Sequence, residues 1–236
     1  VGSQDQGLQK SITNNQGIQD FEQIISGDYG HLVSGNNGIG IWANYPGFTI
    51  YYPNIANSNA SMSLDFPGSG YLWIAPLMAH PSSPEKVILG GGGVSGGNHL
   101  VELSALGNQI TYDEHLFNFS GTISAMGYSP IDSSYRYVLT ENGKFYYSLD
   151  NGENWTMTSS FTGPGSHYFY GSTIWASRQE LETVYIGGSG YSNSPVYVSY
   201  NHGETFSAMD NGLPNTLVFQ LSGTSDDALL FAATEI

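Results

Sequence analysis

Two aspartates near the start of the sequence have surroundings that could support chemistry. Asp5 in SQDQG and Asp28 in SGDYG both lie close to glycine, after or before a strand-like segment. Glycoside hydrolysis uses two carboxylates about 5–9.5 Å apart that flank the scissile bond. We therefore consider this pair as catalytic candidates at a common channel mouth, with Tyr29, Trp42 and Tyr45 stacking on a sugar. The alternative is that both aspartates cap turns, which is the commoner role of such short motifs.

Metal and cofactor chemistry find little support in the sequence. The chain has no cysteine, so disulfides, thiolate nucleophiles and zinc–cysteine sites are excluded. Its six histidines are dispersed without metal-ligand spacing, and we expect no metal site. Acidic turns such as SLDNGEN and TSDDA offer oxygens to Ca²⁺, but the ligand spacing of an EF-hand loop is missing. No cofactor is therefore expected, and Ca²⁺ stays as the alternative.

The charge balance restricts the class of partner. Twenty Asp and Glu stand against five Lys and Arg, a formal charge of −15. Nucleic acids and anionic membrane surfaces would be repelled, since both are bound through clustered basic residues. No run of about eighteen apolar residues exists, so no membrane span is expected. The Lys-poor surface, rich in Asn, Ser, Thr, Gly and Tyr, favours a secreted or cell-surface protein, and the absence of Cys fits either a bacterial secreted protein or a cytosolic one.

The elements that would carry these residues are strands. The 31 glycines alternate with short aromatic and β-branched runs, and no window of ten residues has a helical apolar period. Two eleven-residue segments, FYYSLDNGENW and VYVSYNHGETF, align over a distance of 51 residues. The aligned positions are Ser148 with Ser199, Asp150 with Asn201, Gly152 with Gly203, and Trp155 with Phe206. The fold class is therefore all-β with an internal repeat.

The repeat has a structural explanation. The carboxylate of Asp150 can accept backbone N–H bonds across a turn, and Gly152 can adopt a positive φ at no steric cost. Asn201 can make the same bonds as Asp150 but could not replace a catalytic acid. The substitution favours a structural role, in which Trp155 and Phe206 return apolar rings to the layer between sheets.

A second phrase precedes each copy: a polar turn, a short apolar strand and glycine, as in HPSSPEKVILGGG. Each period then holds about four strands in roughly 45–50 residues, the size of a β-propeller blade. We expect blades at about 26–68, 69–119, 120–162 and 163–212, with a shared or incomplete blade made by 1–25 and 213–236. The chain is then either a small closed propeller or an arc of a larger one, and we favour the arc.

The motif Ser-x-Asp-x-Gly-x-x-Trp at residues 148–155 resembles the Asp-box, or bacterial neuraminidase repeat (BNR). Asp-boxes are found in sialidases, xyloglucan-hydrolase-like propellers and sortilin-type receptors, where the hairpin is generally remote from the active face. The segments VGSQDQGLQKS and SGDYGHLVS resemble phrases of large secreted, glycosyl-hydrolase-like propellers of Bacteroidetes-type bacteria. The resemblance implies further blades or a partner chain. A complete sialidase site is excluded, because its three-arginine clamp exceeds the two arginines present, Arg136 and Arg178.

Two aromatic segments, residues 70–78 and 166–177, allow two interpretations. Trp73, Tyr168, Tyr170 and Trp175 could form a carbohydrate platform, or they could fill the inner strands of two blades, which we favour. The function expected first is a scaffold or binding module for carbohydrate or protein. The alternatives are a glycoside hydrolase that uses the carboxylate pair, and a receptor-type propeller that binds a peptide.

Overall fold

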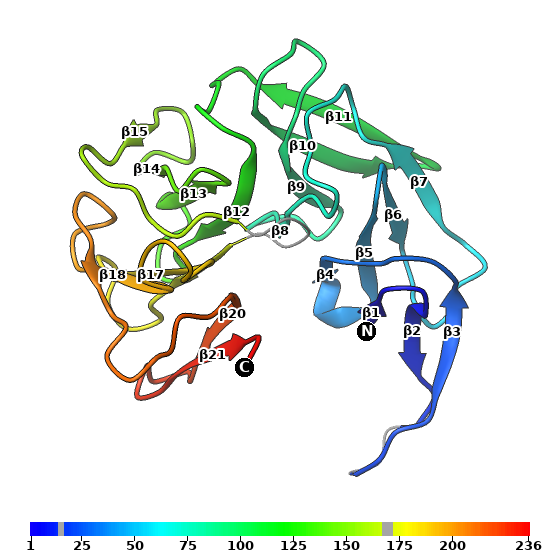
Figure 1. Ribbon diagram of the computed structural model, residues 1–236. Coiled ribbons are helices and arrows are strands. Elements are labelled where there is room, and N and C mark those ends of the chain that lie inside the picture. The colour runs from blue at the N-terminus through cyan, green and yellow to red at the C-terminus, as the bar shows by residue number, and fades with distance from the viewer. Residues whose placement is uncertain (14–16, 167–171) are drawn as a thin grey trace.

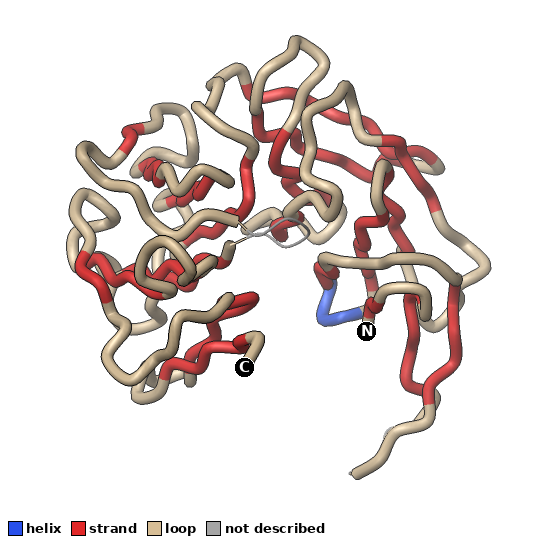
Figure 2. Tube along the Cα trace, in the orientation of Figure 1, coloured by secondary structure: helices blue, strands red, loops and turns tan. Residues whose placement is uncertain are grey.

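The computed structural model describes residues 1–13, 17–166 and 172–236. These residues form short strands joined by turns, with a single 3-10 turn, η1 (Asn36–Gly38), as their helical element (Figure 2). The all-β class is therefore confirmed. No helix in this part of the chain has the length and apolar character needed to cross a membrane.

Four antiparallel sheets of four strands follow one another along the chain, and we call them the first to fourth blades. The first blade contains β4 (Leu32–Gly35), β5 (Gly40–Tyr45), β6 (Phe48–Tyr52) and β7 (Met62–Asp65). The second contains β8 (Leu77–Ala79), β9 (Lys86–Gly91), β10 (His99–Leu106) and β11 (Gln109–His115). The third contains β12 (Ile123–Tyr128), β13 (Arg136–Thr140), β14 (Phe145–Ser148) and β15 (Thr156–Met157). The fourth contains β16 (Thr173–Ala176), β17 (Val184–Gly187), β18 (Val196–Ser199) and β19 (Ser207–Ala208).

The blades are arranged radially, as in a β-propeller (Figure 1). Within each blade the strands pair in sequence order, and the first strand lies nearest the axis. The second strands are buried on both faces, which explains continuous apolar runs such as Val87–Leu89 in β9 and Tyr137–Leu139 in β13. The fourth strands are short and exposed in the third and fourth blades.

Two partial sheets flank the four blades. At the N-terminal side β1 (Gly2–Ser3), β2 (Gly7–Ser11) and β3 (Phe21–Ile25) form one sheet, and at the C-terminal side β20 (Val218–Gly223) pairs with β21 (Leu230–Thr234). No strand pairing joins these two sheets among the described residues, and Figure 1 shows them facing each other at the two ends of an open arc. The described residues thus form an open arc and not a small closed propeller, and the assignment of residues 1–25 and 213–236 to one blade stays a prediction.

The hydrophobic core is divided among the joints between neighbouring sheets. Trp42 of the first blade packs with Leu89 and Val101 of the second, and Ile88 of the second packs with Val138 of the third. Leu139 of the third blade packs with Ile186 of the fourth, and Val196 packs against the β20–β21 sheet. Each sheet thus stabilises its neighbours by burying apolar area on the face that it presents to them.

Candidate functional site

The two aligned hairpins form the same hydrogen bonds. In the first, the Ser148 hydroxyl accepts from the N–H of Gly152 at 2.9 Å and donates to Asp150 Oδ1 at 2.8 Å, and that oxygen accepts from the N–H of Asn154 at 2.9 Å. In the second, Ser199 accepts from Gly203 at 2.8 Å, and Asn201 Oδ1 accepts from the N–H of Thr205 at 3.0 Å.

These contacts show that the polar side chains of the hairpins stabilise the turn by hydrogen bonds to its backbone. The hydrogen bonds from Asn154 and Ser148 lower the pKa of Asp150, so this carboxylate stays ionised and bound to the backbone. Trp155 packs edge-on against Phe119 with ring centroids 5.2 Å apart, and Phe206 stacks on Phe161 at 4.5 Å. Each hairpin therefore closes its blade and contributes an aromatic ring to the adjacent joint.

Candidate ligand-binding groups lie on the axis of the arc. A cavity of about 330 Å³, here called the upper compartment, opens where the inner strands begin and has a mainly apolar lining. It is lined by residues 2–4, Asp28, Tyr29, Gly30, His31, Trp73, Ile74, Ser172, Phe219 and Gln220. A cavity of this size is at the small end of the range for specific ligand sites, which is about 300–1,000 Å³.

The two predicted catalytic aspartates are in contact, but they differ in their position relative to the upper compartment. The backbone N–H of Asp5 donates to Asp28 Oδ1 at 2.7 Å, and Asp5 itself has a φ of 62° in the turn after β1. Asp28 lines the upper compartment, whereas Asp5 does not. Asp28 therefore acts as a turn cap through one oxygen and is also placed at the cavity.

Of the three aromatic residues predicted to stack on a sugar, one lines the upper compartment and two do not. Trp42 was expected to contact a ligand, and this is wrong: its side chain is 0% exposed, stacks on Tyr51 at 4.3 Å and belongs to the joint between the first and second blades. Tyr45 packs between Tyr29 and Phe48 and does not line the cavity. Tyr29 does line it, although burial, followed by Tyr52 and Tyr45, raises its pKa to about 12.

Among the described aromatic residues that line the upper compartment, Trp73 is the most exposed, at 42%. Its segment was favoured as an inner strand, but the strand begins only at Leu77, and Trp73 lies in the turn before it. Trp175 instead packs in the last joint, under the guanidinium of Arg178 at 5.2 Å. Tyr168 and Tyr170, named with these two, lie outside the described residues.

A second cavity continues below the first along the axis. This lower compartment has a volume of about 230 Å³ and a mainly polar lining that includes Ser124 and Thr173. It shares three residues with the upper compartment, namely His31, Ser172 and Gln220. Burial lowers the pKa of His31, so its imidazole is neutral at neutral pH.

Sequence reasoning missed His31, Ser172, Phe219 and Gln220. They come from loops and strands up to 189 residues apart in the sequence, and only the radial packing of inner strands brings them to one axis. The available signal was positional, because each lies at or just before the first strand of its sheet.

The arrangement suits a neutral ligand better than a metal or an anion. No group of three or more His, Asp or Glu among the described residues could hold a metal ion. Asp28 is the charged side chain among the described residues that line the upper compartment, and neither Arg136 nor Arg178 lines it. In the glycine-rich segment Gly90–His99, residues 90–93 are buried and residues 94–97 are exposed; a Cβ on Gly92 would lie 2.2 Å from the carbonyl oxygen of Ser69.

Neither known protein families nor curated proteins match this sequence. Solved structures similar to it include a GH74 enzyme of Niastella koreensis, with a TM-score of 0.65 and 17% identity over 86% of this chain and 32% of that one. An ancestral GH74 enzyme aligns with a TM-score of 0.59 and 15% identity over 87% of this chain and 27% of that one. The β-propeller domain of Myceliophteria thermophila Cps50 (Swd1) aligns with a TM-score of 0.61 and 8% identity, over 89% of this chain and 67% of that one.

The chain thus spans about a third of the length of the GH74 enzymes that it matches. At these identities the likeness concerns architecture alone. Together with the radial four-stranded sheets, it shows that this chain has a β-propeller fold, built as an open arc of blades.

Proposed function

We propose that this chain is part of a propeller protein that binds a neutral carbohydrate in the upper compartment. The observation that carries the proposal is the joint presence of an exposed tryptophan and a carboxylate in one mainly apolar cavity on the axis. The C–H face of a sugar ring packs on an aromatic plate, and its hydroxyls hydrogen-bond to fixed acceptors. Trp73 would supply the plate and the second oxygen of Asp28 the acceptor.

The charge of the chain supports a neutral rather than an acidic glycan. The formal charge of −15 repels anions, and no Lys or Arg lines the upper compartment among the described residues. We further propose a secreted or cell-surface location, in keeping with the Lys-poor and Cys-free composition. We also propose that more blades or a partner chain extend the arc, in keeping with the length of the GH74 neighbours.

The test is a glycan array followed by titration calorimetry with the neutral glycan that binds best. We expect Trp73→Ala to weaken binding about tenfold or more, as for loss of a stacking ring at a binding hot spot. The matched control is Tyr200→Ala, which removes an exposed aromatic ring outside the cavity. Binding of acidic glycans only, or equal binding by both variants, would overturn the proposal.

Glycoside hydrolysis is the second candidate, and the position of Asp28 in the cavity together with the GH74 neighbours favours it. Hydrolysis needs a second carboxylate, and the described lining of the upper compartment supplies one only. Release of reducing ends from a polysaccharide, lost in Asp28→Asn but kept in Asp5→Asn, would favour this candidate. Binding without turnover in the unmodified protein would leave the binding module as the function.

A further inference from the structure

The two compartments on the axis differ in chemistry and meet at one histidine. The upper compartment is mainly apolar and is lined by Trp73, whereas the lower one is mainly polar and is lined by Ser124 and Thr173. His31 lines both, together with Ser172 and Gln220. A ligand that occupies both compartments therefore contacts the region lined by His31, Ser172 and Gln220.

The lower compartment is built on hydrogen bonds that fix its polar groups. Ser124 Oγ lies 2.6 Å from Ser172 Oγ and donates to the carbonyl of Leu139 at 3.2 Å. Thr173 Oγ1 accepts from the N–H of Leu221 at 3.2 Å. These bonds join the third and fourth blades to β20, so the lining is held in place before any ligand arrives, which reduces the ordering cost of binding.

The imidazole of His31 has hydrogen-bonding capacity that the described residues do not use. Its backbone carbonyl accepts from the N–H of Asn44 at 3.1 Å, but no hydrogen bond joins its ring to any residue in 1–13, 17–166 or 172–236. A neutral imidazole offers one N–H donor and one acceptor nitrogen. A sugar hydroxyl can donate and accept at once, and it matches such a pair of groups without adding charge.

We infer that the axis is one continuous binding site for a neutral oligosaccharide of at least two sugar units, with His31 as the residue that binds the unit between the compartments. The inference rests on the proposed function. It adds the minimum length of the ligand and names His31 as the residue that hydrogen-bonds to the second sugar unit. One ring would stack on Trp73 in the upper compartment, and the next would hydrogen-bond to His31 and the polar lining below.

The experiment uses calorimetry with cello-, xylo- and manno-oligosaccharides of one to five units. We expect the dissociation constant to fall by about tenfold from one unit to two or three and then to level off, because further units lie beyond the lower compartment. In His31→Ala, we expect disaccharide binding to weaken about five- to tenfold, the usual effect of losing a buried hydrogen bond, with monosaccharide binding unchanged.

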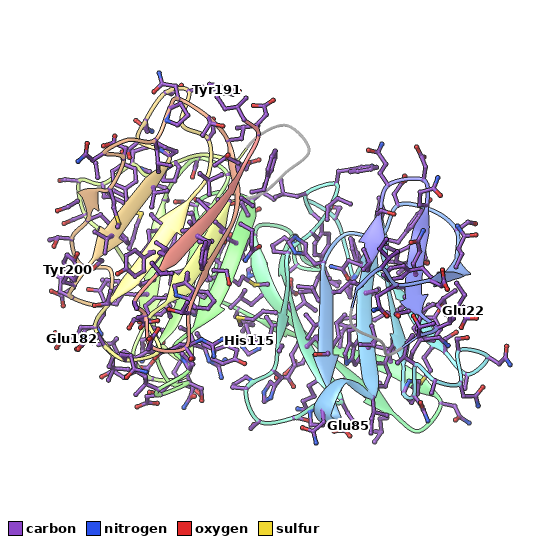
Figure 3. The ribbon with its side chains drawn as sticks, turned by 90° about the horizontal axis from the view of Figure 1, so that it is seen from below. Glu22, Glu85, His115, Glu182, Tyr191 and Tyr200 are labelled. Carbon is purple, nitrogen blue, oxygen red and sulfur yellow. The ribbon has the colours of Figure 1, made fainter. Side chains whose placement is uncertain are left out.

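Two further variants make the result specific. His31→Gln keeps a donor and an acceptor and should recover most of the affinity. If the loss in His31→Ala came only from a change in the structure, His31→Gln would not recover it. His115→Ala is the matched control, because His115 is the last residue of the outer strand β11 and lines neither compartment; Figure 3 labels it in the lower half of the view. Its binding should be unchanged.

The failures of the two proposals are distinguishable. If none of the three series binds, the carbohydrate function is overturned and this inference with it. If monosaccharides bind as tightly as longer chains, or if His31→Ala folds and binds like the unmodified protein, the function stands and the inference is wrong. Circular dichroism of each variant identifies loss of binding that comes from misfolding, and in that case the His31→Gln result decides.

Discussion

The backbone N–H of Asp5 donates a hydrogen bond of 2.7 Å to the Asp28 carboxylate, and this bond joins the partial N-terminal sheet to the wall of the upper compartment. Asp5 has a φ of 62°, a conformation that needs support from neighbouring groups. The carboxylate that would contact a ligand is therefore also the group that holds the turn.

This dual role predicts different effects for two substitutions of Asp28. Asp28→Asn keeps an oxygen acceptor for the Asp5 N–H and should change the free energy of unfolding by less than about 0.5 kcal/mol. Asp28→Ala removes the acceptor and should cost about 1 kcal/mol. Urea denaturation measures both. Equal stability of the two variants would show that the Asp5 bond does not support the turn.

The buried hairpin serines should contribute more to the free energy of unfolding than exposed serines do. Ser148 is 2% exposed and accepts from the N–H of Gly152, so Ser148→Ala leaves that donor without its partner. We expect a loss of about 1–2 kcal/mol, and a similar loss for Ser199→Ala, which makes the equivalent bond to Gly203. Ser192→Ala is the exposed control and should be neutral. Chemical denaturation of the three variants tests the ranking.

Gly203 is required for two reasons at once. Its φ is +97°, and a Cβ at this position would lie 2.3 Å from the ring of Phe145, which is fully buried. We expect Gly203→Ala to cost about 2–4 kcal/mol, since it combines backbone strain with overpacking. Gly212 has a φ of +87° but open space around it, so Gly212→Ala isolates the backbone contribution at about 1 kcal/mol. A loss no larger at Gly203 than at Gly212 would contradict the packing argument.

The Asp150 position of the first hairpin should be sensitive to acid, whereas the equivalent Asn201 of the second should not, because its amide does not titrate. The hydrogen bonds from Asn154 and Ser148 hold the pKa of Asp150 below its ordinary value of 3.8. A depressed folded-state pKa stabilises the fold above the unfolded pKa, and this stability is lost as the pH falls through the folded pKa. Below about pH 4 the melting temperature of the unmodified protein should approach that of Asp150→Asn, whereas near pH 7 the unmodified protein should melt higher.

Asn201 shows that an amide at this position keeps the backbone bond without a titrating group. Asp150→Asn also loses the bond in which Asn154 Nδ2 donates to Asp150 Oδ2, so the change of the difference with pH, and not its size at one pH, reports the ionisation of Asp150. Thermal unfolding of both proteins between pH 3 and pH 7 measures the difference. A constant gap between the two melting temperatures over this range would mean that ionisation of Asp150 does not stabilise the turn.

The period of four strands could be read from the sequence because it depends on local chemistry. Polar turns, glycines with positive φ and short apolar runs each determine a strand or a turn within a few residues. The same holds for the hairpins at Ser148 and Ser199, where the hydrogen bonds span four residues. These are short-range interactions, and their residue types identify them.

The site could be predicted only in part because burial depends on how sheets pack. Trp42 and Trp73 both lie in short segments rich in aromatic and apolar residues, yet one is 0% and the other 42% exposed. The difference arises because Trp42 is on a second strand between two blades, while Trp73 precedes an inner strand. No local pattern distinguishes these positions, and the same is true of His31 and Gln220, which meet across the axis.

The division of the core into separate joints has a consequence for cooperativity. Each apolar cluster connects two adjacent sheets, so the stability of a sheet depends on how many neighbours cover it, as in a linear array of units. The β20–β21 sheet has one such neighbour, whereas the third blade has two. Amide hydrogen exchange should therefore be slowest in β9 and β13 and should quicken toward both ends of the arc, so that the chain opens from its edges inward.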